Sequence, residues 1–62
     1  MQNQINQRRT QAGLTQQELA TTCGVSRQTI NAIENDKYDP TLKLAFALAN
    51  SLHTTVDELF RQ

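Results

Sequence analysis

The sequence predicts an all-α fold of five short helices that form one domain over residues 1–62. Three observations indicate this fold. Pairs of threonine and glutamate recur at the spacing of a helix capping box, at Thr15 and Glu18 and again at Thr55 and Glu58. Apolar residues between these signals follow helical spacing. The chain also contains no repeat, linker or low-complexity segment that would divide it.

The first helix is expected from about Asn3 to Ala12, with Ile5 and the short side chain of Ala12 facing inward. Gly13 follows and is expected to end this helix. Glutamine and asparagine dominate its first turns, a composition that is also found in disordered tails. Because the segment is short and contains Ile5, we interpret it as a helix with a frayed beginning.

The second helix is expected to begin at Gln16, directly after the capping residue Thr15. Leu19 and Ala20 supply its apolar positions. Cys23 continues the same spacing, and Gly24 then stands where a left-handed residue ends a helix at little cost. The second helix is therefore expected to end near Cys23.

The third helix is expected from about Arg27 to Glu34, because Ser26 is a favourable N-cap. Ile30 and Ile33 give it a narrow apolar stripe, and its other residues are mostly polar. Two short helices joined by a turn that contains glycine are the helix-turn-helix motif. The second helix of this motif enters the major groove of DNA with its N-terminal residues toward the bases.

A polar loop, residues 35–40, precedes the fourth helix. This helix has two possible caps: Thr41, or Asp39 with Pro40 in the first helical position. Its broad apolar stripe, wide enough to face both the core and a neighbour, consists of Leu42, Ala45, Phe46, Leu48, Ala49 and Leu52.

His53 comes after the last apolar position of the fourth helix and is expected to be a turn residue rather than a catalytic or metal-binding one. The second capping box, Thr55 to Glu58, then begins a short fifth helix. Val56, Leu59 and Phe60 lie on the apolar side of this helix, which is expected to close the core.

The first residues of the third helix suit the recognition of base edges. Arg27 matches the paired acceptors of guanine, Gln28 can both donate to and accept from adenine, and Thr29 can pack its methyl group on thymine. The alternative is that these polar residues only face solvent.

Net charge argues mildly against nucleic acid, because six Lys and Arg residues balance six Asp and Glu residues. The distribution softens this objection. Asp57 and Glu58 lie near the end of the chain, whereas the first two thirds contain Arg8, Arg9, Arg27, Lys37 and Lys43. We therefore expect a dipolar surface, few phosphate contacts and a shallow dependence of DNA affinity on salt.

Composition excludes several other classes of protein. A single cysteine and a single histidine allow neither an intramolecular disulfide nor a metal-ligand cluster. We find no nucleophile and base pair and no phosphate-binding loop, so the chain is not expected to be an enzyme or to use a cofactor. No apolar run approaches membrane-spanning length and no signal peptide is present, which predicts a cytoplasmic protein without a membrane partner.

The sequence resembles the Cro/repressor-type (XRE) helix-turn-helix family of transcription regulators, most closely its very small, single-domain repressors. The resemblance extends from about Ile5 to Phe60. The matching stretches are Gly13-Leu14-Thr15-Gln16-Gln17-Glu18-Leu19-Ala20, Gly24-Val25-Ser26-Arg27-Gln28-Thr29-Ile30, Ile33-Glu34-Asn35, Pro40-Thr41-Leu42 and Val56-Asp57-Glu58-Leu59-Phe60.

The resemblance implies a lambda-repressor-like fold and a DNA-binding regulator that acts as a homodimeric repressor on an inverted repeat. Base reading is assigned to Arg27, Gln28, Thr29 and Asn31, since Ala32 offers only a methyl group. Contacts with the DNA backbone are assigned to Gln16, Ser26, Asn35, Lys37 and Tyr38, although a solvated loop is an alternative for Tyr38.

The resemblance also implies a structural ion pair between Arg9 and Glu34. Cys23 takes a position where the family usually has Val or Leu, so it is expected to be a small core residue rather than a redox sensor. Candidates for the dimer interface are Phe46, Leu59 and Phe60, each of which could instead be internal.

A different class of function is also open. The scaffold could serve as a protein-interaction module, such as an antitoxin whose main partner is a toxin, and zero net charge favours this slightly. The polar start of the third helix, from Arg27 to Thr29, counts against it. No small-molecule ligand is evident from the sequence.

Overall fold

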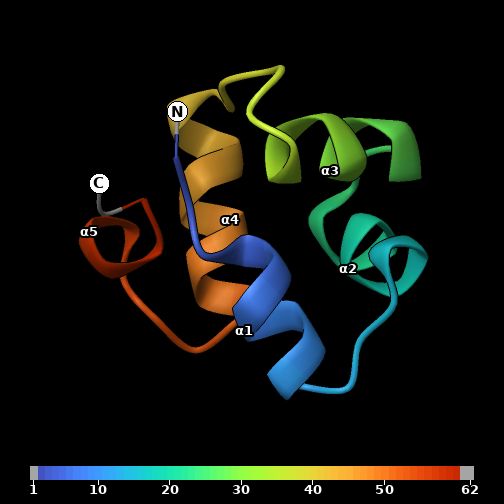
Figure 1. Ribbon diagram of the computed structural model, residues 1–62, viewed down its shortest axis with the longest axis horizontal. Helices are drawn as coiled ribbons and strands as arrows, with labels where there is room; N and C mark the ends of the chain where they lie inside the picture. Colours follow the sequence, from blue (N-terminus) through green and yellow to red (C-terminus); the bar gives the residue numbers. More distant parts are fainter. Residues whose placement is uncertain (1, 61–62) are drawn as a thin grey trace.

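The computed structural model describes residues 2–60, which contain five helices and no strand (Figure 1). The helices are α1 (Ile5–Gln11), α2 (Gln16–Cys23), α3 (Arg27–Glu34), α4 (Leu42–Ser51) and α5 (Val56–Leu59). This arrangement confirms the predicted all-α fold and the bounds predicted for α2 and α3. None of the helices in this part of the chain has the length and apolar character needed to cross a membrane.

Helix α1 begins two residues later than predicted, because Asn3 is held in a different role. Its Oδ1 accepts a hydrogen bond from the backbone N–H of Ile5 at 3.1 Å, and its Nδ2 donates to the carbonyl of Ile33 at 2.8 Å. Asn3 therefore attaches the start of α1 to α3. Ile5 is buried as expected, but Ala12 is exposed, since it lies past the last helical residue.

Helix α2 begins and ends at the residues that the sequence indicated. The Thr15 Oγ1 accepts from the backbone N–H of Glu18 at 3.0 Å, and the Glu18 carboxylate accepts from the backbone N–H of Thr15 at 2.8 Å, which completes the capping box. Gly24 ends α2 with φ +73°. Helix α3 then packs against α2, with Ile30 and Ile33 fully buried (Figure 1).

Helix α4 is capped by Thr41 and not by Asp39. The Thr41 hydroxyl accepts from the backbone N–H of Leu44 at 3.2 Å, which decides between the two possible caps. His53 turns the chain after α4 with φ +56°, as expected of a turn residue. At the start of α5, the Thr55 hydroxyl accepts from the backbone N–H of Glu58 at 3.2 Å.

The core lies where all five helices meet, and its largest fully buried side chains are Ile5, Leu19, Ile30, Ile33, Leu48 and Leu59. Leu59 has no exposed surface, so it fills the core and the expectation that it forms a dimer interface is wrong. Cys23 is half-buried against this core, in agreement with its expected packing role. Two apolar side chains of α4, Leu42 and Phe46, are instead 68% and 59% exposed.

Candidate nucleic-acid interface

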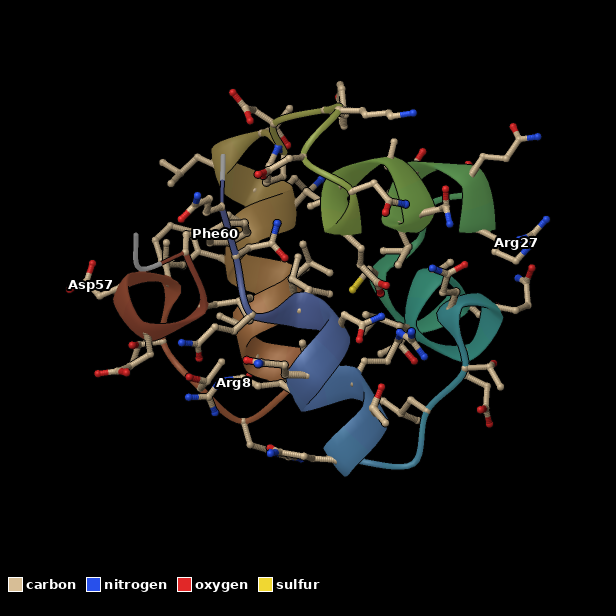
Figure 2. All side chains as sticks on the ribbon, viewed as in Figure 1. Arg8, Arg27, Asp57 and Phe60 are labelled. Atoms are coloured by element: carbon tan, nitrogen blue, oxygen red, sulfur yellow. The ribbon has the colours of Figure 1, made fainter. Side chains whose placement is uncertain are left out.

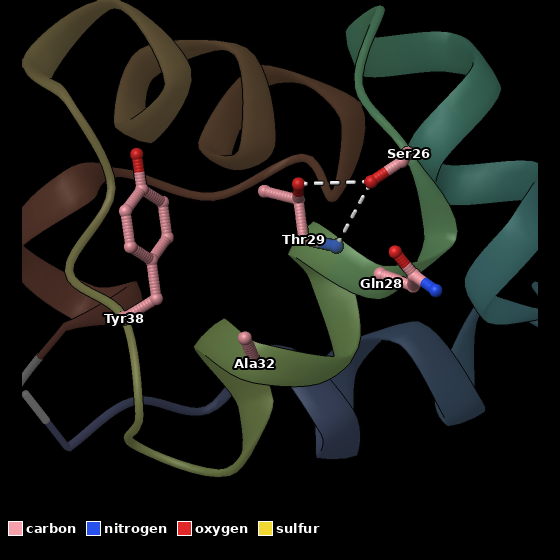
Figure 3. A pocket seen from close by; sticks show the side chains of 5 residues that line it. All are labelled: Ser26, Gln28, Thr29, Ala32 and Tyr38. Carbon is pink, nitrogen blue, oxygen red and sulfur yellow. Dashed lines mark hydrogen bonds between the residues drawn. The ribbon is translucent and has the colours of Figure 1, made fainter.

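The first turn of α3 presents polar side chains on a firmly capped helix end. Arg27 and Gln28 are exposed, and Thr29 is half-buried. The Ser26 Oγ accepts from the backbone N–H of Thr29 at 3.2 Å and lies 3.0 Å from the Thr29 Oγ1 (Figure 3). Because this cap fixes the first turn, the two exposed side chains project from a defined position on the surface.

A shallow depression runs along this face of α3. It is lined by Ser26, Gln28, Thr29, Ala32 and Tyr38. Figure 3 shows Tyr38, on the loop after α3, standing across the depression from Thr29 and Ala32. Ala32 contributes only a methyl group, as the sequence indicated, so the polar groups of this depression come from its neighbours.

A second hollow continues from Thr29 and Tyr38 to the start of α4. Thr41 and Lys43 line its far side, and Lys43 is exposed. Lys43 was not among the predicted site residues. Its position in the first turn of the helix after the loop is the signal that could have placed it here.

The end of α3 and the loop after it contain three residues that the sequence predicted to contact the DNA backbone. Lys37 and Tyr38 are both exposed. Asn35 is less free, since its Nδ2 donates to the carbonyl of Asn31 at 2.8 Å and lies 3.3 Å from the Asn31 Oδ1. Asp36 takes a positive φ of +62°, which turns the chain so that Lys37 N–H donates to the carbonyl of Ala32 at 2.9 Å.

An ion pair joins α1 to the last residue of α3. The Arg9 Nε lies 2.7 Å from the Glu34 Oε2, and the side chains of Arg9 and Glu34 are 14% and 3% exposed. A further nitrogen of the same guanidinium, Nη1, donates to the carbonyl of Leu14 at 2.8 Å. Arg9 therefore connects α1, the turn before α2, and α3.

Two amide side chains also donate hydrogen bonds to Glu34 of the ion pair. Of these two residues, only Gln16 was predicted as a site residue. Asn6 Nδ2 donates to the Glu34 Oε1 at 3.0 Å, and Gln16 Nε2 donates to the same oxygen at 3.1 Å. Gln16 was predicted to contact DNA, and the structure places it against α3, with its Oε1 3.5 Å from the Asn31 Nδ2. No local pattern pointed to Asn6, because its partner is 28 residues away.

The charge of Glu34 is stabilised by its surroundings. Burial alone would raise the pKa of this carboxyl, but hydrogen bonds from Arg9, Asn6 and Gln16, together with the positive charge of Arg9, outweigh burial. The net effect lowers the pKa of Glu34 below its ordinary value. The carboxylate is therefore ionised and acts only as an acceptor at neutral pH.

Two charged residues, Arg27 and Asp57, lie at opposite edges of the molecule. Figure 2 shows Arg27 at the edge formed by the start of α3 and Asp57 at the opposite edge, on α5. Phe60 lies on the side of Asp57, away from Arg27 (Figure 2). The exposed start of α3 is thus remote from the acidic residues of α5.

Comparisons with known proteins agree on one family. Residues 5–59 match the helix-turn-helix family. The chain is 48% identical over 60 residues to an HTH-type transcriptional regulator from Methanocaldococcus jannaschii. The matched residues cover 97% of this chain and 91% of the relative.

Solved structures give the same result. The restriction-modification controller protein C.AhdI from Aeromonas hydrophila superposes with a TM-score of 0.85 at 30% identity, covering 92% of this chain and 86% of that chain. A complex of the SinR and SinI proteins matches with a TM-score of 0.89 at 26% identity over the whole of this chain, which spans only 62% of the matched chain.

Proposed function

The chain belongs to the XRE-type helix-turn-helix family of DNA-binding transcriptional regulators, and we propose that it is a dimeric repressor that reads an inverted repeat. Its five helices have the lambda-repressor-like arrangement. It is a regulator and not an enzyme.

One observation carries the proposal for base reading. Arg27 and Gln28 are exposed on the first turn of α3, while the opposite side of the helix is anchored by the buried Ile30 and Ile33. Such a helix can enter the major groove with its first turn leading. Arg27 then suits guanine and Gln28 suits adenine, each good bidentate contact giving about 1–3 kcal/mol of discrimination.

Thr29 and Asn31 complete the proposed base-reading set. Thr29 lines the depression beside Gln28, where its methyl group suits the thymine methyl group. Asn31 is exposed one turn further along α3 and offers both a donor and an acceptor.

Backbone contacts are proposed at the two sides of α3. Lys37, Asn35 and Tyr38 follow α3, and Gln16 begins α2, where the helix N-terminus attracts a phosphate. Ser26 is retained in this set, since its O–H can donate to a phosphate while its Oγ accepts from Thr29 N–H. We add Lys43, because it is exposed and lines the second hollow together with Tyr38.

The proposed dimer interface centres on α4. Leu42 and Phe46 are one helical turn apart, on the same face, and both are largely exposed. Phe60 is half-buried and packs at the edge of the core. A patch of this kind on a small domain suits contact with a second copy of the chain, which would also add to the small core.

A matched pair of variants tests this interface. Phe46→Ala is expected to shift the chain toward monomer in sedimentation experiments, whereas Tyr38→Ala, which removes the other largely exposed aromatic ring, is expected to leave the dimer intact. An unchanged dimer in Phe46→Ala would contradict the proposed interface.

The proposed location of the protein is the cytoplasm, because a repressor acts where the DNA is.

Selection from a random pool of double-stranded DNA at physiological salt tests the proposed function as a whole. Two half-sites in inverted orientation, with centres one helical turn or roughly 34–36 Å apart, are the expected motif. A motif with a single half-site would contradict the dimeric part of the proposal. No enriched motif, together with tight binding of a protein partner, would favour an interaction module of the antitoxin kind.

A further inference from the structure

Glu34, Gln16 and Asn31 form a continuous line of polar contacts from the inside of the molecule to the exposed face of α3. We infer that Gln16, held by Glu34, is a positioning residue that sets the direction in which Asn31 presents its amide to DNA. This inference rests on the proposed function, and it adds to Gln16 a role in sequence specificity besides the proposed contact with phosphate.

The first step is the orientation of Gln16. Its Nε2 donates to the Glu34 Oε1 at 3.1 Å. An ionised carboxylate has no hydrogen to donate, so the Gln16 amide must turn its NH₂ group toward Glu34. Asn6 and Arg9 also donate to Oε1, at 3.0 and 3.3 Å, and the Glu34 side chain is only 3% exposed. The acceptor is therefore fixed in place by two side chains of α1.

The second step is the orientation of Asn31. With its NH₂ group committed to Glu34, Gln16 turns its Oε1 toward α3, where it lies 3.5 Å from the Asn31 Nδ2. An oxygen here favours the Asn31 NH₂ group on this side and the Asn31 Oδ1 on the other. That Oδ1 lies 3.3 Å from the Asn35 Nδ2, a donor, which favours the same orientation.

The consequence is a preset pattern of donor and acceptor on the exposed face of α3. Both atoms of the Asn31 amide keep hydrogen-bonding capacity, since NH₂ has a second hydrogen and Oδ1 a second lone pair. Adenine presents an acceptor and a donor side by side in the major groove, so the direction of an asparagine amide decides whether it fits. Fixing that direction before binding favours one base over the others.

Base preference measured position by position separates this role from a phosphate contact. Selection from a random DNA pool is carried out with the wild type, Gln16→Ala, Asn31→Ala and the control Gln7→Ala, which alters an exposed residue of α1 that does not contact Glu34 in the structure. Asn31→Ala is expected to reduce preference at one half-site position by about fivefold or more. Gln16→Ala is expected to reduce preference at the same position by about threefold, with Gln7→Ala unchanged.

Each outcome bears on one claim. If Gln16→Ala weakens binding to all sequences equally and keeps the base preference of the wild type, the positioning role is wrong and Gln16 serves only phosphate or stability. Gln16→Met, which keeps side-chain length without an amide, replaces Gln16→Ala if the latter does not fold. If the wild type itself selects no motif, the proposed function fails, which is a separate result.

Discussion

The Nε of Arg9 lies 2.7 Å from the Oε2 of Glu34, and this contact ties the first helix to the last residue of the proposed recognition helix. Both side chains are shielded from solvent. The position of α3 on the surface therefore depends on a residue of α1 that does not itself belong to the proposed interface.

Removal of one partner of this pair is expected to destabilise the fold. Arg9→Ala leaves the Glu34 carboxylate without its opposite charge, and we expect the free energy of unfolding to fall by about 3 kcal/mol. Urea denaturation followed by circular dichroism measures this change. Gln7→Ala, on the exposed side of the same helix, is expected to change it by less than about 0.5 kcal/mol. Similar values for both variants would refute a structural role for the pair.

The same carboxylate predicts a dependence of stability on pH. Because the pKa of Glu34 is lower in the folded chain than its ordinary value of 4.5, ionised Glu34 stabilises the fold above that ordinary value. This stabilisation is lost as the pH falls below that value toward the folded pKa. The stability difference between the wild type and Glu34→Gln should therefore narrow from pH 7 to pH 3 in urea denaturation. A difference that widens on acidification would show that the sign is wrong.

Two substitutions of His53 are expected to change the stability of the fold in opposite directions, because the φ of +56° at this residue lies in the left-handed region. A side chain costs about 1–2 kcal/mol there, and the entropy of glycine in the unfolded chain offsets about 0.5–1 kcal/mol of the relief. We expect His53→Gly to raise the free energy of unfolding by about 0.5 kcal/mol. His53→Val should lower it by about 1 kcal/mol, since branched residues tolerate this region poorly. Equal stability of the two variants in thermal denaturation would argue against strain at this turn.

Local signals predicted most of the fold. The capping threonines, Ser26 and Gly24 act on neighbours within a few residues, so their effects are visible in the sequence, and the bounds of α2 and α3 follow from them. The errors have a different origin. Asn3 lies outside α1, because its side chain donates a hydrogen bond to the carbonyl of Ile33, 30 residues away. The burial of Leu59 depends on how α5 packs on the rest of the chain.

In the candidate site, too, some features could be predicted from the local sequence and others depend on the fold. The chemistry of Arg27 and Gln28 can be predicted from residue type and from their place at the start of a helix. The contacts of Asn6 and Gln16 with Glu34 join helices that are separate in the sequence, so no local pattern predicts them. Lys43 was missed although its place in the first turn of the helix after the loop could have indicated it, and the fold brings it into the same hollow as Tyr38.

Lys37 tests the proposed contacts with the DNA backbone. Lys37→Ala removes an exposed cation and is expected to weaken binding to all sequences by a similar factor. The slope of log affinity against log salt concentration should become shallower by about 1. Titrations of a selected site and of an unrelated site at several salt concentrations measure both quantities. A loss confined to the selected site would instead make Lys37 a base-reading residue.

The most direct test of the account compares the wild type with the Arg27→Ala, Gln28→Ala double variant on a selected operator and on unrelated DNA. Both side chains are exposed, so the variant should keep the thermal stability of the wild type. The account predicts that the variant loses most of its preference for the operator, at least about 2 kcal/mol in discrimination, while binding to unrelated DNA changes far less. Unchanged discrimination in the folded double variant would contradict the claim that α3 reads the bases.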